Sequence, residues 1–471
     1  MLGGVLAASF VPVFVDRLTT RPRREAMASV SAVVTLATVV LVVSTVLLVV
    51  LAPEVIDLYS IGGAPHLGAA DLAREHVLAI ELLRYFAPQL LAYGLISLIA
   101  AVLATEERFV AVGVVPIINN LVGIAVLGAF AAVATHSEVA HTQLSSGLVL
   151  LLGLGTTAGV VLQAVALIPS LRRSGARLRW RWRPNDPAVA MILRLSSWTI
   201  GFVAANQLAV FVVQALEFHL QGVPQYSYAY QFFLFPYAVV AASVVNVATP
   251  SLARAHALGN SAEVGQRFGR AGRQVLSLVL PAAVGYLVLA KPAITLVLQH
   301  GNFGPGAVDQ TAATLALFAL GLPGFCVFFL AIRTFQAMRD TRTAFYCYLL
   351  ENGTNIALAF VFYRPLGIKG LALSYSIAYT LAAIAAVVVL HRRLGTIGGR
   401  AILSSSLRSV VLSVVMAVTI AFVAAVIGSG TGLFGWVRLL VTVAAGGIAY
   451  LGGAGIAASR RGWQTSRRTR R

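Results

Sequence analysis

The chain has 471 residues, of which 59% are hydrophobic and only 11% are charged, and its formal net charge is +19. This balance excludes an ordinary soluble globular protein and is typical of a chain whose solvent is lipid. The arginines stand between apolar runs rather than along one soluble face, so they indicate membrane topology and argue against a nucleic-acid partner.

Apolar runs that can cross a hydrocarbon core of roughly 30 Å as helices recur along the whole length. They predict an all-α polytopic membrane protein with about thirteen spans and no sizeable soluble domain. Prolines inside several runs suit helices that bend during transport, although inert kinks are equally common. In chain order, the predicted spans are 1–16, 27–53, 77–104, 109–135, 144–170, 189–216, 226–250, 274–299, 311–336, 343–363, 366–390, 401–428 and 433–457.

The loops between these runs alternate in charge. Arginine-rich segments follow the first, fifth, seventh, ninth and eleventh predicted spans and also close the chain, which places them in the cytoplasm. Glu138, Glu217 and Asp309 stand in intervening loops without arginine, which belong outside. The alternation predicts a multi-pass protein of a bacterial cytoplasmic membrane with its C-terminus in the cytoplasm.

The sequence also carries a weak internal repeat. Residues 104–127 align with 337–360, and residues 5–17 resemble 242–254, both at an offset of about 235 residues. Such parallel repeats are typical of transporters. The first copy lacks roughly fifty residues that the second copy contains, so we expect the first helix and part of the second to be missing from a truncated start.

Several longer segments carry a family resemblance: ASFVPVFVDR, LLRYFAPQLLAYGL, AAVLATEERFVAVGVVPIINN, LRRSGARLR, YAYQFFLFPYAVVAASV, LQHGNFGPGAVDQTAATLALFALGLPGF and RTFQAMRDTRTA. Together they resemble the MurJ (MviN) lipid II flippases of the multidrug, oligosaccharidyl-lipid and polysaccharide exporter superfamily. The resemblance implies two pseudo-symmetric six-helix lobes plus two C-terminal helices. The expected parts are an incomplete N-terminal lobe (1–170), an arginine-rich linker (171–188), a C-terminal lobe (189–392), two extra helices (401–457) and a basic cytoplasmic tail (458–471).

The function that the resemblance implies is outward translocation of lipid II, the undecaprenyl-diphosphate-linked peptidoglycan precursor, by alternating access. Two alternatives stay open: export of another polyprenyl-linked glycan or a drug, and an inactive membrane scaffold of the cell-wall machinery. The sequence offers no nucleophile, acid–base pair or metal-ligand cluster, so we expect neither an enzyme nor a cofactor or metal. The expected partners are lipid II, membrane lipids and cell-wall synthesis proteins.

Polar residues at membrane depth are functional candidates because lipid cannot solvate them. Tyr230 and Gln231 stand where Gram-negative relatives carry an Asp-Arg pair. The sequence around them resembles the actinobacterial branch of the family. Buried amides also commonly join helices, and Arg84 can instead pair with Glu81. The substrate-cleft candidates are Tyr230, Gln231, Arg84, Asn206 and Gln207.

Glu351 is the most unusual polar residue, because it is a carboxylate well inside an apolar run. With Asn355 it forms the ion-coupling candidate, through which a proton or cation could drive transport. Alternatively, Asn352 and Asn355 could satisfy it as a packing residue. An isolated ionised carboxylate is costly at this depth, so we expect Glu351 to be protonated or to face a hydrated cleft near a cation.

Overall fold

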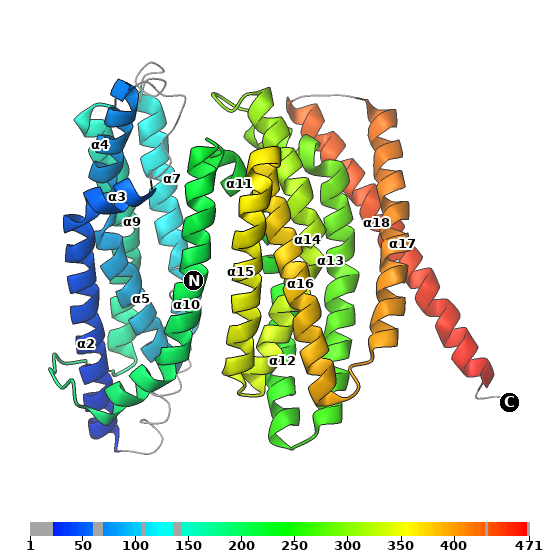
Figure 1. Ribbon diagram of the computed structural model, residues 1–471, viewed down its shortest axis with the longest axis horizontal. Helices are drawn as coiled ribbons and strands as arrows, with labels where there is room; N and C mark the ends of the chain where they lie inside the picture. Colours follow the sequence, from blue (N-terminus) through cyan, green and yellow to red (C-terminus); the bar gives the residue numbers. More distant parts are fainter. Residues whose placement is uncertain are drawn as a thin grey trace. The chain divides into compact units, whose positions relative to one another are not determined.

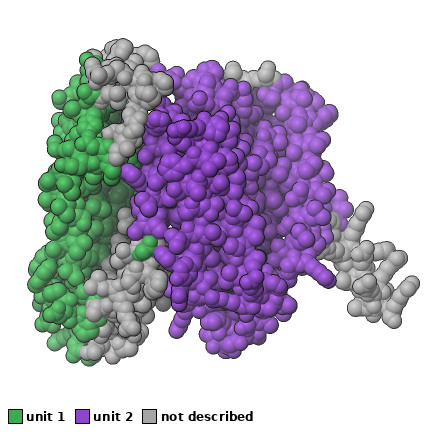
Figure 2. All heavy atoms as spheres, in the orientation of Figure 1, with its two compact units in different colours: residues 1–201 green, residues 202–471 purple. Residues whose placement is uncertain are grey.

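The computed structural model describes residues 22–59, 69–105, 109–134, 144–176, 178–428 and 432–468. Within these ranges the chain consists of α-helices, one short π-helix and their connections, with no strand (Figure 1). It divides into two compact units, residues 1–201 and residues 202–471 (Figure 2).

Ten of the described helical segments are long and apolar enough to cross a membrane. They are Arg23–Val50, Ala73–Leu103, Val110–Val133, Ser146–Arg173, Val223–Ala257, Ser261–Leu298, Pro305–Ala337, Ile368–Leu394, Gly399–Ile427 and Gly432–Ile456. The predicted all-α polytopic membrane fold is confirmed.

Helices also cover two further predicted spans, 189–216 and 343–363, whereas the predicted span 1–16 lies outside the described residues. These two helices are α10, Pro187–His219, and α15, Thr341–Leu366. α15 carries Glu351, Asn352 and Asn355 in its middle, and these polar side chains lower its hydropathy.

The first unit is built around α5, which packs against α2 and α9, and α9 packs in turn against α7. Its buried apolar core includes Val30 and Val33 of α2 and Leu98 and Val102 of α5. The helices of this unit before α10 are α2 (Arg23–Val50), α3 (Ala52–Tyr59), α4 (Ala69–Phe86), α5 (Pro88–Thr105), α6 (Phe109–Val114), α7 (Pro116–Val133) and α9 (Ser146–Arg173).

The arginine-rich linker after α9 is held along α2 by backbone hydrogen bonds. The N–H of Arg179 donates to Oγ of Ser31 at 3.2 Å, and the N–H of Arg181 donates to Oγ1 of Thr35 at 3.0 Å. Both acceptors are buried hydroxyls of α2, so the linker supplies their polar partners.

The second unit is centred on α14, whose side chains are buried along most of its length and which packs against α13 and α16. Its core is a continuous cluster of aliphatic and aromatic side chains. The helices of this unit after α10 are α11 (Val223–Pro236), η1 (Tyr237–Ala241), α12 (Ala242–Ala257), α13 (Ser261–Leu298), α14 (Pro305–Ala337), α15, α16 (Ile368–Leu394), α17 (Gly399–Ile427) and α18 (Gly432–Arg468).

Two glycines let α14 approach α16 closely. A Cβ added to Gly321 would lie 2.4 Å from Cα of Ser376, and one added to Gly324 would lie 2.8 Å from Cα of Thr380. Small residues at such crossings bring helix backbones together, which replaces the hydrophobic driving force that is absent in lipid. This contact fixes the centre of the second unit.

Three of the five prolines expected to interrupt spans do so in the structure, whereas Pro281 and Pro323 lie inside the continuous helices α13 and α14. Single turn residues, Ala87 and Val115, precede Pro88 and Pro116 and separate α4 from α5 and α6 from α7. Pro236 ends α11, and the π-helix η1 follows it directly. Proline lacks the N–H that a regular helix needs, so the backbone bonding changes at these points.

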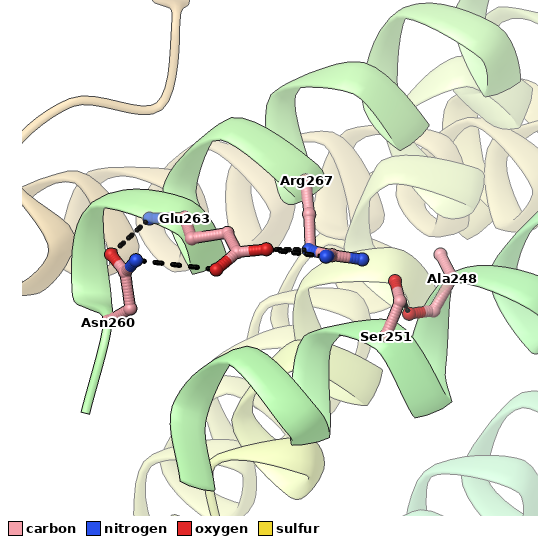
Figure 3. Close-up of polar contacts among 5 residues, drawn as sticks. All are labelled: Ala248, Ser251, Asn260, Glu263 and Arg267. Atoms are coloured by element: carbon pink, nitrogen blue, oxygen red, sulfur yellow. Dashed lines mark hydrogen bonds and ion pairs between the residues drawn. The ribbon is translucent and has the colours of Figure 1, made fainter. Parts of the chain in front are cut away.

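The turn from α12 to α13 shows how the sequence begins a helix at one end of the unit. Oδ1 of Asn260 accepts a hydrogen bond from the N–H of Glu263 at 3.0 Å, and Nδ2 of Asn260 donates to Oε2 of Glu263 at 3.3 Å (Figure 3). Arg267, one turn later, donates to Oε1 of the same carboxylate. These contacts satisfy N-terminal donors of α13 and fix its first turn.

Of the three carboxylates predicted in outer loops, Glu138 lies outside the described residues and Asp309 lies near the beginning of α14. Glu217 does not lie in a loop either. It falls in the last turn of α10, and only 3% of it is exposed. Its neighbours Leu216 and Leu220 pack against the core of the second unit, and this packing draws the end of the helix inward. The prediction failed because a single carboxylate between two apolar runs resembles a polar loop.

Candidate functional site

The candidate site lies inside the second unit, where α11, α14, α15 and α16 supply aromatic and polar side chains. Tyr230 of α11 is half-buried, and its hydroxyl lies 3.4 Å from the hydroxyl of Tyr375 on α16. Its ring packs against Phe233 at 6.0 Å and against Phe318 of α14 at 5.8 Å between centroids. Tyr230 is therefore held by an aromatic core that joins three helices.

Glu351 of α15 lies beside this aromatic core with only 1% of its surface exposed. Its Oε2 is buried and has no hydrogen-bond partner among the described residues. Nor does any described Lys, Arg or His form an ion pair with it.

Five tyrosines of α11, α15 and α16 belong to this aromatic core, and we call them the tyrosine cluster. Their rings contact one another or share Phe318 and Phe328 of α14 as neighbours. A tyrosine O–H can donate a hydrogen bond to a carboxylate or accept one from a carboxylic acid. The cluster consists of Tyr226, Tyr230, Tyr348, Tyr375 and Tyr379.

The neighbouring amides do not satisfy Glu351 in the described structure. Nδ2 of Asn352 donates to the backbone carbonyl of Tyr348 at 2.9 Å. Oδ1 of Asn355 accepts a hydrogen bond from Oγ of Ser374 at 3.0 Å, which joins α15 to α16. Both amides are buried, and no hydrogen bond from either to Glu351 is found among the described residues.

Sequence reasoning missed most of the tyrosine cluster. Tyr226 and Tyr230 are four residues apart on α11, and Tyr375 and Tyr379 are four residues apart on α16. Side chains at this spacing share one face of a helix, so each pair presents its hydroxyls to the same side. Two tyrosine pairs at this spacing within predicted spans were the signal available in the sequence.

The other cleft candidates of the second unit lie apart from this core. Gln231 is exposed on α11, although its neighbour Tyr230 points into the aromatic core. On α10, Asn206 is half-buried and Gln207 is exposed, and no hydrogen bond of either is found in the described part of the chain. Their part in a cleft stays a prediction.

Arg84 belongs to the first unit, where it is exposed near the end of α4. It lines a cavity of about 530 Å³ with Pro53, Val77, Ile80, Glu81 and Tyr85. Among the described residues it forms no ion pair with Glu81, whose Oε1 instead accepts a hydrogen bond from the Tyr85 hydroxyl at 3.2 Å. Arg84 thus keeps its guanidinium donors available for an anionic group.

This arrangement suits binding and proton or cation exchange. A buried carboxyl without a counter-charge can take up a proton or bind a small cation. Nearby hydroxyls and an amide oxygen can then accept a hydrogen bond from the protonated acid or coordinate the cation. Within the described residues, no group of His, Cys, Asp and Glu has the make-up of a transition-metal site.

Comparison with known proteins identifies the family. The model of the family described as "Lipid II flippase MurJ" matches residues 1–441. A "Probable lipid II flippase MurJ" of Rhizobium tropici is 28% identical over 83% of this chain and 71% of its own length. One of Rhizobium meliloti is 28% identical over 71% of this chain, and the match spans 61% of that relative's length.

Solved structures show the same fold. A structure titled "Lipid II flippase MurJ, inward closed conformation" has a TM-score of 0.74 at 20% identity and covers 98% of this chain and 90% of its own. An inward-facing multidrug resistance MATE family transporter has a TM-score of 0.69 at 14% identity, covering 84% of this chain and 87% of its own. The match of the family model over nearly the whole sequence shows that the chain is a member of the MurJ lipid II flippase family.

Proposed function

We propose that this protein translocates lipid II across the cytoplasmic membrane by alternating access. The observation that carries the proposal is the match of the family model to residues 1–441, which includes the whole of the candidate site. The transport is a conformational change with no covalent step. By the alternation of loop charge, arginine-rich ends such as the turn before α13 face the cytoplasm, and so does the C-terminus.

Within this function, Glu351 and Asn355 are the ion-coupling residues. Glu351 is buried without a counter-charge. Such a carboxyl gains or loses a proton or a small cation when a cleft opens and admits water. Asn355 and Ser374 link the helix that carries Glu351 to α16, so a change at the carboxyl can alter how these helices pack. The coupling species is a proton or a small cation.

The cleft residues contact the cargo in this proposal. The diphosphate of lipid II needs hydrogen-bond donors or cations inside the membrane. Arg84 offers a guanidinium in the first unit, and Tyr230, Gln231, Asn206 and Gln207 offer hydroxyl and amide donors in the second. Cell-wall synthesis proteins are the expected neighbours of such a flippase.

Complementation tests the proposal. The chain is expressed in a bacterial strain whose own lipid II flippase is depleted, and lipid II on the outer leaflet is measured by cleavage with an added enzyme that cannot enter the cell. Restored growth together with restored cleavage is the expected result. Normal amounts of membrane-inserted protein without outer lipid II would contradict the proposal and favour another glycan, a drug or a scaffold role.

A further inference from the structure

A second polar site of the second unit is lined by helices other than those that form the aromatic core. A cavity of about 510 Å³ opens between the end of α13, the end of α17 and the beginning of α18. Its walls combine apolar residues such as Leu289, Leu296 and Leu439 with polar residues. The polar residues include Lys291, His300 and Arg438.

The two permanent cations of this cavity are isolated charges in their own helices. Lys291 is the only charged residue of α13 after Arg273, and Arg438 is the only charged residue between Gly432 and Ile456. A charge inside a transmembrane helix is costly, so it is retained where it has a partner or a ligand. That both helices place their isolated cation in one cavity indicates a shared anionic ligand.

Arg438 has no carboxylate partner among the described residues, whereas Lys291 has one that is exposed to water. Arg438 is half-buried and donates from Nη2 to the carbonyl of Ala424 at 3.2 Å, and no described carboxylate pairs with it. Lys291 lies 2.7 Å from Oδ1 of Asp309. Both side chains of that pair are more than half exposed, so water screens the attraction.

The chemistry of the walls limits the ligand. A guanidinium and an ammonium together favour a phosphate oxygen, and the guanidinium has further N–H donors for it. Trp436, which also lines the cavity and is 43% exposed, belongs to the residue type that lies at the level of lipid head groups. The leucines beside it can contact an acyl chain that descends from the same phosphate.

We propose that this cavity binds the head group of an anionic glycerophospholipid of the surrounding membrane, with its phosphodiester held between Lys291 and Arg438. The site differs from the cargo cleft in position and in ligand. A zwitterionic lipid fits it less well, because its own ammonium group faces the same cations.

Native mass spectrometry tests this site on the full chain purified in detergent. Phosphatidylglycerol and phosphatidylcholine with identical acyl chains are added at equal concentration, and the lipid retained by the protein is counted. The wild type should retain phosphatidylglycerol preferentially. Lys291→Gln and Arg438→Gln should each lower the preference about fivefold, the effect of one basic residue near a phosphate, and the double variant should abolish it.

Arg364→Gln is the matched control. Arg364 is an exposed arginine in the last turn of α15 that donates to the Tyr363 hydroxyl and does not line the cavity. This variant should keep the wild-type preference. Equal retention of both lipids by the wild type, or an unchanged preference in a monodisperse double variant, would overturn the proposal. A loss of preference with Arg364→Gln as large as with Arg438→Gln would also overturn it, because net charge alone would then explain the binding.

Discussion

The hydroxyl of Ser374 donates a hydrogen bond to Oδ1 of Asn355 at 3.0 Å, and both side chains are buried where α16 meets α15. The single hydroxyl proton of Ser374 is shared with the carbonyl of Leu371 in its own helix, at 2.7 Å. Asn355 lies one helical turn after Glu351, so this bond holds the turn that carries the buried carboxyl. It is therefore one of the contacts that attach the candidate coupling site to α16.

Replacing Ser374 by alanine removes this attachment. Oδ1 of Asn355 is then left buried without its donor, which should lower the free energy of unfolding by about 1 to 3 kcal/mol. Thermal denaturation of the purified protein in detergent measures the loss. Ser243→Ala is the control, because the exposed hydroxyl of Ser243, in the first turn of α12, donates only to the carbonyl of Val239 in the adjoining η1. Equal melting temperatures for both variants would show that the bond contributes nothing.

Replacing Glu351 by glutamine tests coupling. Glutamine keeps the shape and can form hydrogen bonds but cannot release a proton, so protein levels should stay near normal while lipid II export, or its dependence on external pH, is lost. Glu351→Asp keeps the charge and should retain part of the export. The flippase-depleted strain described above provides the assay. Normal export with Glu351→Gln at every pH would remove Glu351 from the mechanism.

The glycine contact between α14 and α16 gives a stability prediction. Gly321→Ala places a methyl group against Cα of Ser376, so the helices must separate, at a cost of about 1 to 3 kcal/mol. Gly306→Ala, in the first turn of the same helix, meets no atom within 4 Å and should not destabilise the protein. Thermal denaturation of both variants measures the difference. The melting temperature should fall for Gly321→Ala and not for Gly306→Ala, and equal melting temperatures would contradict the prediction.

Asp340 begins α15 and links it to α16. Its Oδ1 accepts from the N–H of Thr343 at 3.1 Å, and its Oδ2 pairs with Arg393. Partial burial alone would raise the pKa of the Asp340 carboxyl, but the Thr343 hydrogen bonds and the Arg393 guanidinium lower it below its ordinary value.

The lowered pKa of Asp340 predicts how stability depends on pH. The contribution of the charged carboxylate is complete above its unfolded pKa, about 3.9, and is lost as the pH falls through the lower native pKa. Asp340→Asn keeps the cap but loses the ion pair, so it should be less stable than the wild type at pH 6 by less than about 1 kcal/mol, and the gap should close below about pH 4. Asp340→Ala should lose about 0.5 to 2 kcal/mol more. A gap that widens in acid would contradict this assignment.

The two ends of α13 test the topology. In intact cells, Asn302→Cys, just after the helix, should react with a membrane-impermeant thiol reagent, and Ser261→Cys at its start should not. The native cysteines, Cys326 and Cys347, are buried and should add little background. The reverse labelling pattern would invert the orientation proposed for the protein.

The sequence predicted the helices because apolar runs of sufficient length leave the backbone no other way to satisfy its polar groups in lipid. The predicted boundaries of the helices were wrong where individual residues change the helix or its burial within an apolar run. The span predicted at 226–250 is three segments from Val223 to Ala257, because Pro236 leads into a π-helix. Glu217 was misplaced because only tertiary packing shows that the end of α10 is buried.

The candidate site was predictable only in part. Glu351 and Asn355 stood out because they are polar residues within an apolar run. Tyr375 and Tyr379 did not, because tyrosine is also common in spans and their role depends on which helix packs against which. Contacts such as Ser374 with Asn355 join segments that the hydropathy pattern treats independently.

The most direct test of the proposed function is translocation by the purified chain. The protein is reconstituted into vesicles that contain fluorescent lipid II, and a membrane-impermeant quencher reports how much lipid II moves between leaflets under an imposed proton or sodium gradient. The wild type should move lipid II faster than protein-free vesicles, and Glu351→Gln should lose the response to the gradient. Wild-type vesicles that match protein-free vesicles under every gradient, with the protein folded and inserted, would contradict the assignment of this chain as a lipid II flippase.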